Sequence, residues 1–116
     1  MTFSRLVAVA VYAAALLANV AATSASFADE KSFTLTIQDH RFKPQTLTVP
    51  AGEKFSLVVV NADPTSEEFE SNDFHVEKVI SAGKQMTFHV GPLSAGSYGF
   101  FGERHKDTAV GNLFAE

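Results

Sequence analysis

The regular spacing of turn signals is the feature that most constrains how this chain folds. Beyond residue 30, short runs of alternating apolar and polar residues are separated by turn signals about every ten residues, as in all-β sandwiches. These turn signals are Asp39-His40-Arg41, Ala51-Gly52, Ser81-Ala82-Gly83 and Ala95-Gly96. No long run shows the period of an α-helix. The pattern predicts an all-β sandwich of about seven strands.

Two stretches of the first half give contrasting signals. Residues 54–61 are almost continuously apolar, which is typical of a strand in the middle of a sheet. The next stretch, residues 63–73, is abruptly acidic, and Thr65 and Glu68 have the spacing of a helix capping box. We expect a short helical turn or an irregular loop there.

Residues 96–113 are expected to form the last hairpin of the sandwich. Tyr98 and Phe100 alternate with smaller residues and lead into a loop, after which Gly111 begins a short final strand. The side chains expected in that loop are those of Glu103, His105 and Asp107. A loop with this composition could collect the ligands of a metal ion.

The N-terminus has the pattern of a secretory signal peptide. Arg5 provides one positive charge, residues 6–17 are an unbroken apolar run, and Ser26-Phe27-Ala28 has small residues at both positions that a signal peptidase reads. We expect cleavage after Ala28, which leaves one domain over residues 29–116, periplasmic and not inserted in the membrane. An uncleaved membrane anchor is the alternative, but the run is Ala-rich and shorter than the roughly 20 apolar residues of a span.

Charge and cysteine content narrow the function classes. Without Arg5, 8 basic residues remain against 13 acidic ones, a net charge near −5. This balance disfavours nucleic acid and anionic membrane surfaces as partners, and favours cations. The chain has no cysteine, so neither a disulfide nor a thiolate metal ligand is available.

Three motifs together resemble the cupredoxins, the Greek-key β-sandwiches that hold blue copper. They are F-x-P-x-x-L-x-V-P-A-G over residues 42–52, the strand that ends at Asn61, and Y-x-F-x-G-x-x-H-x-x-x-A-x-G-x-L over residues 98–113. The resemblance places the cysteine slot at Gly102, the second histidine slot at His105 and the methionine slot at Ala109. Because a blue-copper centre needs a cysteine thiolate, electron transfer through such a centre is chemically excluded.

A second set of motifs looks like the cysteine-free, EfeO-type cupredoxin-like domains. These motifs are E-F-E-S-x-D over residues 68–73, E-K-V-I over residues 77–80, G-P-L-x-x-G-x-Y-x-F-F-G-E-x-H over residues 91–105 and T-A-x-G over residues 108–111. The resemblance implies a role in bacterial periplasmic iron uptake, with a membrane iron permease or another component of that system as partner.

The candidate metal ligands are Glu68, Glu70, Glu103 and His105. In a sandwich of this kind, the acidic segment and the last hairpin loop are expected to meet at one end. Carboxylates with an imidazole suit iron or Cu(II), so we expect an iron or copper ion. Metal affinity should fall as the pH drops, because protons compete for the same lone pairs. Of the remaining candidates, Glu67 could equally serve as a helix-start charge, His75 and His89 are weaker, and His40 lies far along the chain.

The sequence favours metal binding over catalysis, with an accessory role in ferrous iron oxidation left open. The alternative is a metal-free module that recognises a partner protein through its acidic end. A hydrolase built from Ser71, His105 and Asp107 has little support, because no motif frames Ser71 as a nucleophile.

Overall fold

The computed structural model describes residues 30–116, and the predicted signal peptide lies outside this range. The described residues form nine strands and a single 3-10 turn, η2. In chain order these are β1 (Lys31–Gln38), β2 (Arg41–Lys43), β3 (Thr46–Val49), β4 (Phe55–Asn61), β5 (Glu67–Ser71), β6 (Val76–Ile80), β7 (Gln85–Val90), β8 (Gly96–Gly102), η2 (Glu103–His105) and β9 (Val110–Ala115).

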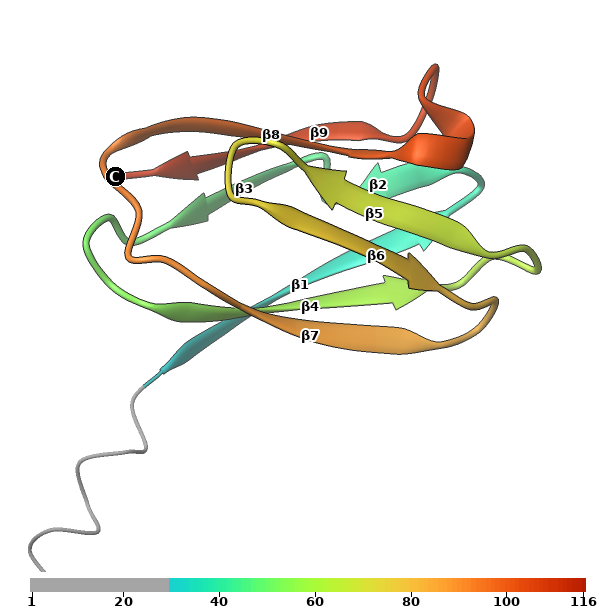
Figure 1. The fold of residues 1–116 in the computed structure, drawn as a ribbon, viewed down its shortest axis with the longest axis horizontal. Helices are drawn as coiled ribbons and strands as arrows, with labels where there is room; N and C mark the ends of the chain where they lie inside the picture. The colour runs from blue at the N-terminus through green and yellow to red at the C-terminus, as the bar shows by residue number, and fades with distance from the viewer. Residues whose placement is uncertain (1–29) are drawn as a thin grey trace, which may run out of the picture.

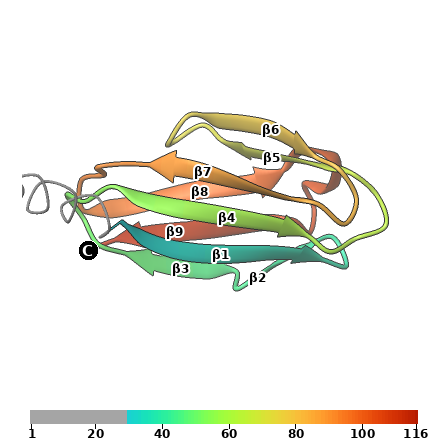
Figure 2. The ribbon, with the colours of Figure 1, turned by 90° about the horizontal axis from the view of Figure 1, so that it is seen from below.

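The strands form two sheets. One sheet has the order β2-β1-β4-β7, and the other has the order β3-β9-β8-β5-β6. Figure 1 shows the five-stranded sheet in the upper part of the view and β1, β4 and β7 in the lower part; seen from below in Figure 2, β1, β4 and β7 lie across β8 and β9. The predicted all-β sandwich is therefore confirmed, and β4 lies between β1 and β7 as expected. Within residues 30–116, no helix has the length and apolar character needed to cross a membrane.

Phenylalanine rings hold the two sheets together. Phe69 of β5 is fully buried, and its ring centroid lies 5.8 Å from those of both Phe42 and Phe100 and 5.4 Å from that of Phe88. Burying one such ring contributes about 2 kcal/mol to folding. These aromatic contacts provide much of the core of a domain that has no disulfide.

The strand count differs from the prediction where Pro44 interrupts the early chain. Residues 41–49 contain two strands, β2, which pairs with β1, and β3, which pairs with β9 in the opposite sheet. Proline has no backbone N–H and cannot donate to a strand ladder, so the ladder stops there and the chain changes sheets.

The acidic segment also differs from the prediction, because it forms a strand. β5 lies between β6 and β8 in the five-stranded sheet and pairs with both, and the expectation of a helical turn or loop is wrong for Glu67–Ser71. The residues of β5 alternate between buried and half-buried positions. Because Glu67 is polar but occupies an inward position, the hydrophobicity pattern does not show this alternation.

One end of the sandwich brings together segments that are distant in the sequence. In Figure 1 the η2 turn lies beside the start of β5 and the β1–β2 turn, at the end opposite the C-terminus. Asp39 and His40 form the β1–β2 turn in left-handed conformations, with φ of 55° and 57°. The Asp63 carboxylate accepts hydrogen bonds from the backbone N–H groups of both, at 2.7 and 3.0 Å, which stabilises this conformation.

Candidate metal site

Strand β5 sends its acidic side chains to two different environments. Glu67 points inward with Phe69 and Ser71, whereas Glu68 and Glu70 point to the outer face of the sheet. Glu67 is 1% exposed, while Glu68 and Glu70 are half-buried. Adjacent glutamates therefore take part in two distinct clusters.

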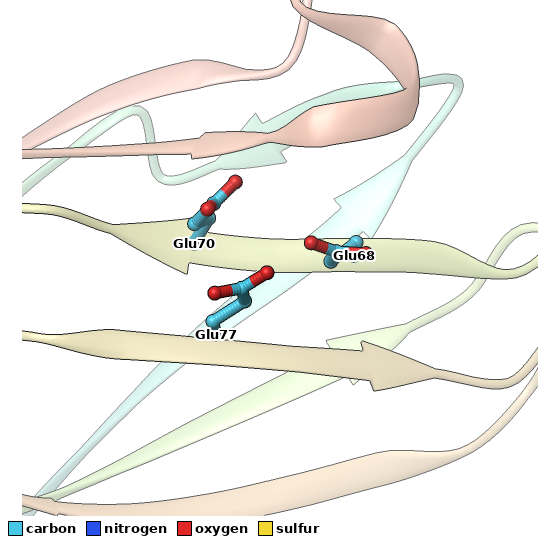
Figure 3. Close-up of side chains that lie close together, drawn as sticks. All are labelled: Glu68, Glu70 and Glu77. Atoms are coloured by element: carbon cyan, nitrogen blue, oxygen red, sulfur yellow. The ribbon is translucent and has the colours of Figure 1, made fainter.

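The first cluster, which we call the acidic face, lies on the outer side of the five-stranded sheet. Glu77 of β6 pairs directly with Glu70 across the ladder, and one carboxylate oxygen from each of Glu68, Glu70 and Glu77 lies within 4.8 Å of the other two. Figure 3 shows Glu77 directed from β6 towards the two carboxylates of β5. Glu103, the first residue of η2, is the fourth carboxylate of the acidic face, and its influence raises the pKa of Glu70.

The pKa values of two carboxyl groups on the acidic face, Glu68 and Glu70, are raised. The pKa of Glu68 is raised by partial withdrawal from water, then by the hydrogen bond to Glu77 and by the negative charges of Glu77 and Glu103. The pKa of Glu70 is raised by the same partial withdrawal, then by its hydrogen bond to Glu103 and by neighbouring carboxylates. Glu68 and Glu70 therefore hold protons more tightly than ordinary glutamates, as expected for carboxylates that are partly withdrawn from water and lie near like charges.

A polar hollow adjoins the acidic face. It has a volume of about 310 Å³, and its lining includes Glu70, Glu77 and His75. Within the described chain, Glu70 Oε2 is buried and makes no hydrogen bond. Buried polar atoms are normally partnered, so this oxygen has a lone pair available for a ligand.

The second cluster pairs the buried Glu67 carboxylate with the partly buried His105 at the end of the sandwich. Glu67 Oε2 lies 2.5 Å from His105 Nδ1, and Glu67 Oε1 accepts hydrogen bonds from the backbone N–H groups of Glu68, at 3.0 Å, and Arg104, at 2.9 Å. Both oxygens of a nearly inaccessible carboxylate are thus satisfied. Because a carboxylate accepts hydrogen bonds, Nδ1 of His105 donates to Glu67 in this contact. The other ring nitrogen, Nε2, takes no part in it.

The His40 ring covers this pair. The imidazoles of His40 and His105 are stacked, with centroids 3.5 Å apart and planes 10° apart. His40 is held there by the strained β1–β2 turn that Asp63 stabilises. The sequence placed His40 far along the chain from the acidic segment, but the β1–β2 turn brings its ring to the η2 end.

The four predicted ligands are therefore divided between the two clusters. Glu68, Glu70 and Glu103 lie together on the acidic face, and His105 lies with Glu67 beneath His40. Sequence reasoning missed Glu77 and undervalued Glu67. Glu77 could have been found by predicting that residues 67–71 and 76–80 pair as a hairpin. Glu67 could have been found from its separation of two residues from Phe69, which puts both side chains on the same face of a strand.

A blue-copper centre does not fit the residues at this end. A Cβ built on Gly102, the cysteine slot of the resemblance, would lie 2.7 Å from Glu67 Cδ and 2.9 Å from Ala109 Cβ. The Glu67 carboxylate thus fills the space that a side chain at position 102 would need. Together with the absence of cysteine, this excludes the thiolate ligand that such a centre requires.

Other candidates have ordinary structural roles or stand apart. Ser71 is buried, donates a hydrogen bond to the Gly99 carbonyl at 2.7 Å and accepts one from the Phe74 N–H at 3.2 Å, which is the role of a turn residue and gives no support to a hydrolase. The His89 ring is exposed and lies near Ser56 and Glu30.

A larger hollow, of about 470 Å³, is lined by amides such as Gln45 and Asn112 and contains no group of carboxylates.

Comparisons with known proteins agree with the fold. The model of the Cupredoxin-like domain family matches residues 7–115. An uncharacterized protein of Rickettsia prowazekii (strain Madrid E) is 44% identical over 77 residues, which cover 66% of this chain and 62% of that protein. A multicopper oxidase shares 15% identity with a TM-score of 0.63, covering 76% of this chain and 39% of the oxidase. The reduced auracyanin of Roseiflexus castenholzii shares 12% identity with a TM-score of 0.62, covering 76% of this chain and 98% of auracyanin.

Proposed function

Because this chain belongs to the cupredoxin-like domain family, and because carboxylates gather on its outer face, we propose that it binds a transition-metal ion there for bacterial iron uptake. The observation that carries this proposal is the convergence of Glu68, Glu70 and Glu77 within 4.8 Å, beside an unpartnered Glu70 oxygen. The ion is cargo that the protein holds and passes on. Glu103 supplies a fourth carboxylate at the rim.

The donor set determines which ions suit this site. Carboxylate oxygens favour hard or borderline cations such as iron and Cu(II), and they disfavour Cu(I), which prefers sulfur. His75, which lines the adjoining hollow, can add an imidazole if its exposed side chain turns towards the carboxylates. We therefore propose iron or Cu(II) as the cargo. Copper is also the metal named for the multicopper oxidase that shares the fold.

Proton competition gives the site a pH dependence. The raised pKa values of Glu68 and Glu70 mean that these carboxylates take up protons at a higher pH than ordinary glutamates. Metal affinity should therefore fall when a neutral solution is made mildly acidic. Equal metal retention at neutral and mildly acidic pH would contradict a site made of these groups.

Calorimetric titration of the metal-free domain with Fe(II), under anaerobic conditions, and with Cu(II) tests the proposal. The wild-type protein should bind close to one ion, and Glu70→Gln should weaken binding about tenfold or more, since it removes a direct ligand and even indirect partners contribute that much. Glu53→Gln is the matched control, because Glu53 is exposed and forms an ion pair with Lys31, away from the acidic face. Absence of binding, or equal affinities for the two variants, would reject the acidic face as the metal site.

The export and transport roles form the wider part of the proposal. The signal-peptide pattern of residues 1–28 supports a periplasmic location, and the resemblance to EfeO-type domains supports a membrane iron permease or another uptake component as partner. Fractionation of cells that express the full chain tests the location. Growth of a deletion strain under iron limitation, with and without the Glu70→Gln variant, tests the role in uptake.

Recognition of a partner protein without a metal is the second candidate function. Large apolar residues are exposed on the same five-stranded sheet as the acidic face, namely Val79 at 45%, Val110 at 41% and Phe114 at 39%. Such residues around charged groups are common at protein interfaces. Metal analysis of protein purified from the periplasm separates the two functions, because near-stoichiometric metal supports the first and clean apo protein supports the second.

A further inference from the structure

We infer that Glu67 and His105 are positioning residues, which hold Glu103 over the acidic face, and that His105 is not itself a ligand of the ion bound there. This inference rests on the proposed function and assigns a role to the buried pair at the end of the sandwich. It also accounts for the division of the predicted ligands into two clusters.

Glu67 accepts three hydrogen bonds, and two of them connect β5 to η2. Glu67 accepts the N–H of Glu68 on its own strand, and from η2 it accepts the N–H of Arg104 and the Nδ1–H of His105. The Arg104 guanidinium also donates to the Ser66 hydroxyl, one residue before β5. Two successive residues of η2 are therefore tied to the start of β5.

Glu103 immediately precedes these two tied residues. Its side chain is 40% exposed and approaches Lys106 Nζ at 3.1 Å, a contact that contributes little to its position in water. Its negative charge nevertheless acts on Glu70 and Glu68 and raises the pKa of both, so like-charge repulsion should drive it away from them. The hydrogen bonds made by Glu67 provide the restraint that keeps η2, and with it Glu103, against β5.

The surroundings of His105 argue against direct ligation on the acidic face. Its Nδ1 is committed to Glu67, which points to the opposite side of β5 from Glu68 and Glu70. Its ring is covered by the parallel ring of His40 at 3.5 Å. The backbone of His105 is also held, because its carbonyl accepts a hydrogen bond from the Ala109 N–H at 2.8 Å. Both the side chain and the backbone of His105 are therefore fixed.

Substitutions that mimic one imidazole nitrogen at a time separate positioning from ligation. Asparagine places an amide N–H near the position of Nδ1 and has no group at Nε2, so His105→Asn can retain the contact to Glu67. Glutamine places its amide near Nε2 and lacks the Nδ1 donor, and alanine has neither. With Fe(II) as the probe, we expect His105→Ala and His105→Gln to bind about tenfold more weakly and His105→Asn to bind within about twofold of wild type.

A double-mutant cycle identifies the route of the effect. If His105 acts through Glu103, His105→Ala should add almost nothing to Glu103→Gln, whereas it should add fully to Glu77→Gln. Weak binding by His105→Asn, or full additivity with Glu103→Gln, would overturn the inference and make His105 a ligand.

Amide hydrogen exchange of the metal-free protein gives a test that needs no ion. The Arg104 amide should exchange slowly in wild type and in His105→Asn, and faster in His105→Ala, because its acceptor is the Glu67 carboxylate. Equal exchange in all three proteins would also overturn the inference. Slow exchange in a wild-type protein that binds no metal would reject the proposed function and leave the restraint of η2 supported.

Discussion

Glu67 and Glu70 belong to the same strand and differ in almost everything that determines what a carboxylate can do. Glu67 is 1% exposed and accepts hydrogen bonds on both oxygens, including two from backbone N–H groups. Glu70 is half-buried among other carboxylates and has one buried oxygen without a hydrogen bond in residues 30–116. The first carboxylate is stabilised by hydrogen bonds within the protein, whereas the second has an oxygen without a partner in the described part of the chain.

The difference arises from the geometry of the strand. Successive side chains of a strand point to opposite faces, so an odd separation in sequence puts Glu67 inside and Glu70 outside. The inner carboxylate meets the donors of a neighbouring turn, while the outer one meets Glu77 across the ladder. Identical chemistry therefore yields a structural group on one face and a candidate ligand on the other.

The largest effect that distinguishes the two carboxylates should come from Glu67→Ala. It leaves the partly buried N–H groups of Glu68 and Arg104 and the Nδ1 of His105 without their acceptor, at a cost of about 3 kcal/mol in the free energy of unfolding. Urea unfolding of the metal-free protein measures this loss. Glu70→Ala should not destabilise the metal-free protein, and a comparable loss for both variants would erase the contrast.

The next effect tests how tightly Glu67 fills its site. Gly102→Ala places a Cβ 2.7 Å from Glu67 Cδ and 2.9 Å from Ala109 Cβ, and such overpacking costs about 2 kcal/mol. Because the clash is with Glu67, the double variant Gly102→Ala with Glu67→Ala should lose less stability than the two single losses combined. Simple additivity in urea unfolding would mean that the Glu67 carboxylate does not define this space.

Much of the fold could be predicted because turn spacing and period-two alternation are local signals. The closing hairpin of β8 and β9 and the central position of β4 follow from them directly. β5 could not be recognised by hydrophobicity, because a glutamate occupies an inward position that the fold satisfies with donors from η2, 37 and 38 residues away. That compensation depends on tertiary structure, which no local pattern contains.

At the candidate site, too, local sequence features predicted some residues, whereas others depend on the tertiary structure. Glu68, Glu70 and Glu103 could be selected from their types and the resemblance, and they do lie together. The role of His105 could not be assigned, since its partners Glu67 and His40 are set by strand parity and by a turn at the far end of β1. Residue type was sufficient to nominate ligands, but side-chain direction decides which cluster each one joins.

The smallest effect, and the one with the most informative sign, should come from Glu77→Gln. In the folded protein the pKa values of Glu68 and Glu70 are raised above the ordinary glutamate value of 4.5, so the folded state binds more protons than the unfolded state in that window. Stability of the metal-free protein should therefore fall as the pH rises from 4.5 through the raised values.

Glu77→Gln removes a negative charge that contributes to both shifts, so the variant should be slightly more stable than wild type at neutral pH and equal to it in acid. Urea unfolding with a chelator present measures the difference, and saturating Fe(II) should reverse its sign because the variant has lost a ligand. A variant that is less stable than wild type at neutral pH without metal would show that the acidic face is not under electrostatic strain.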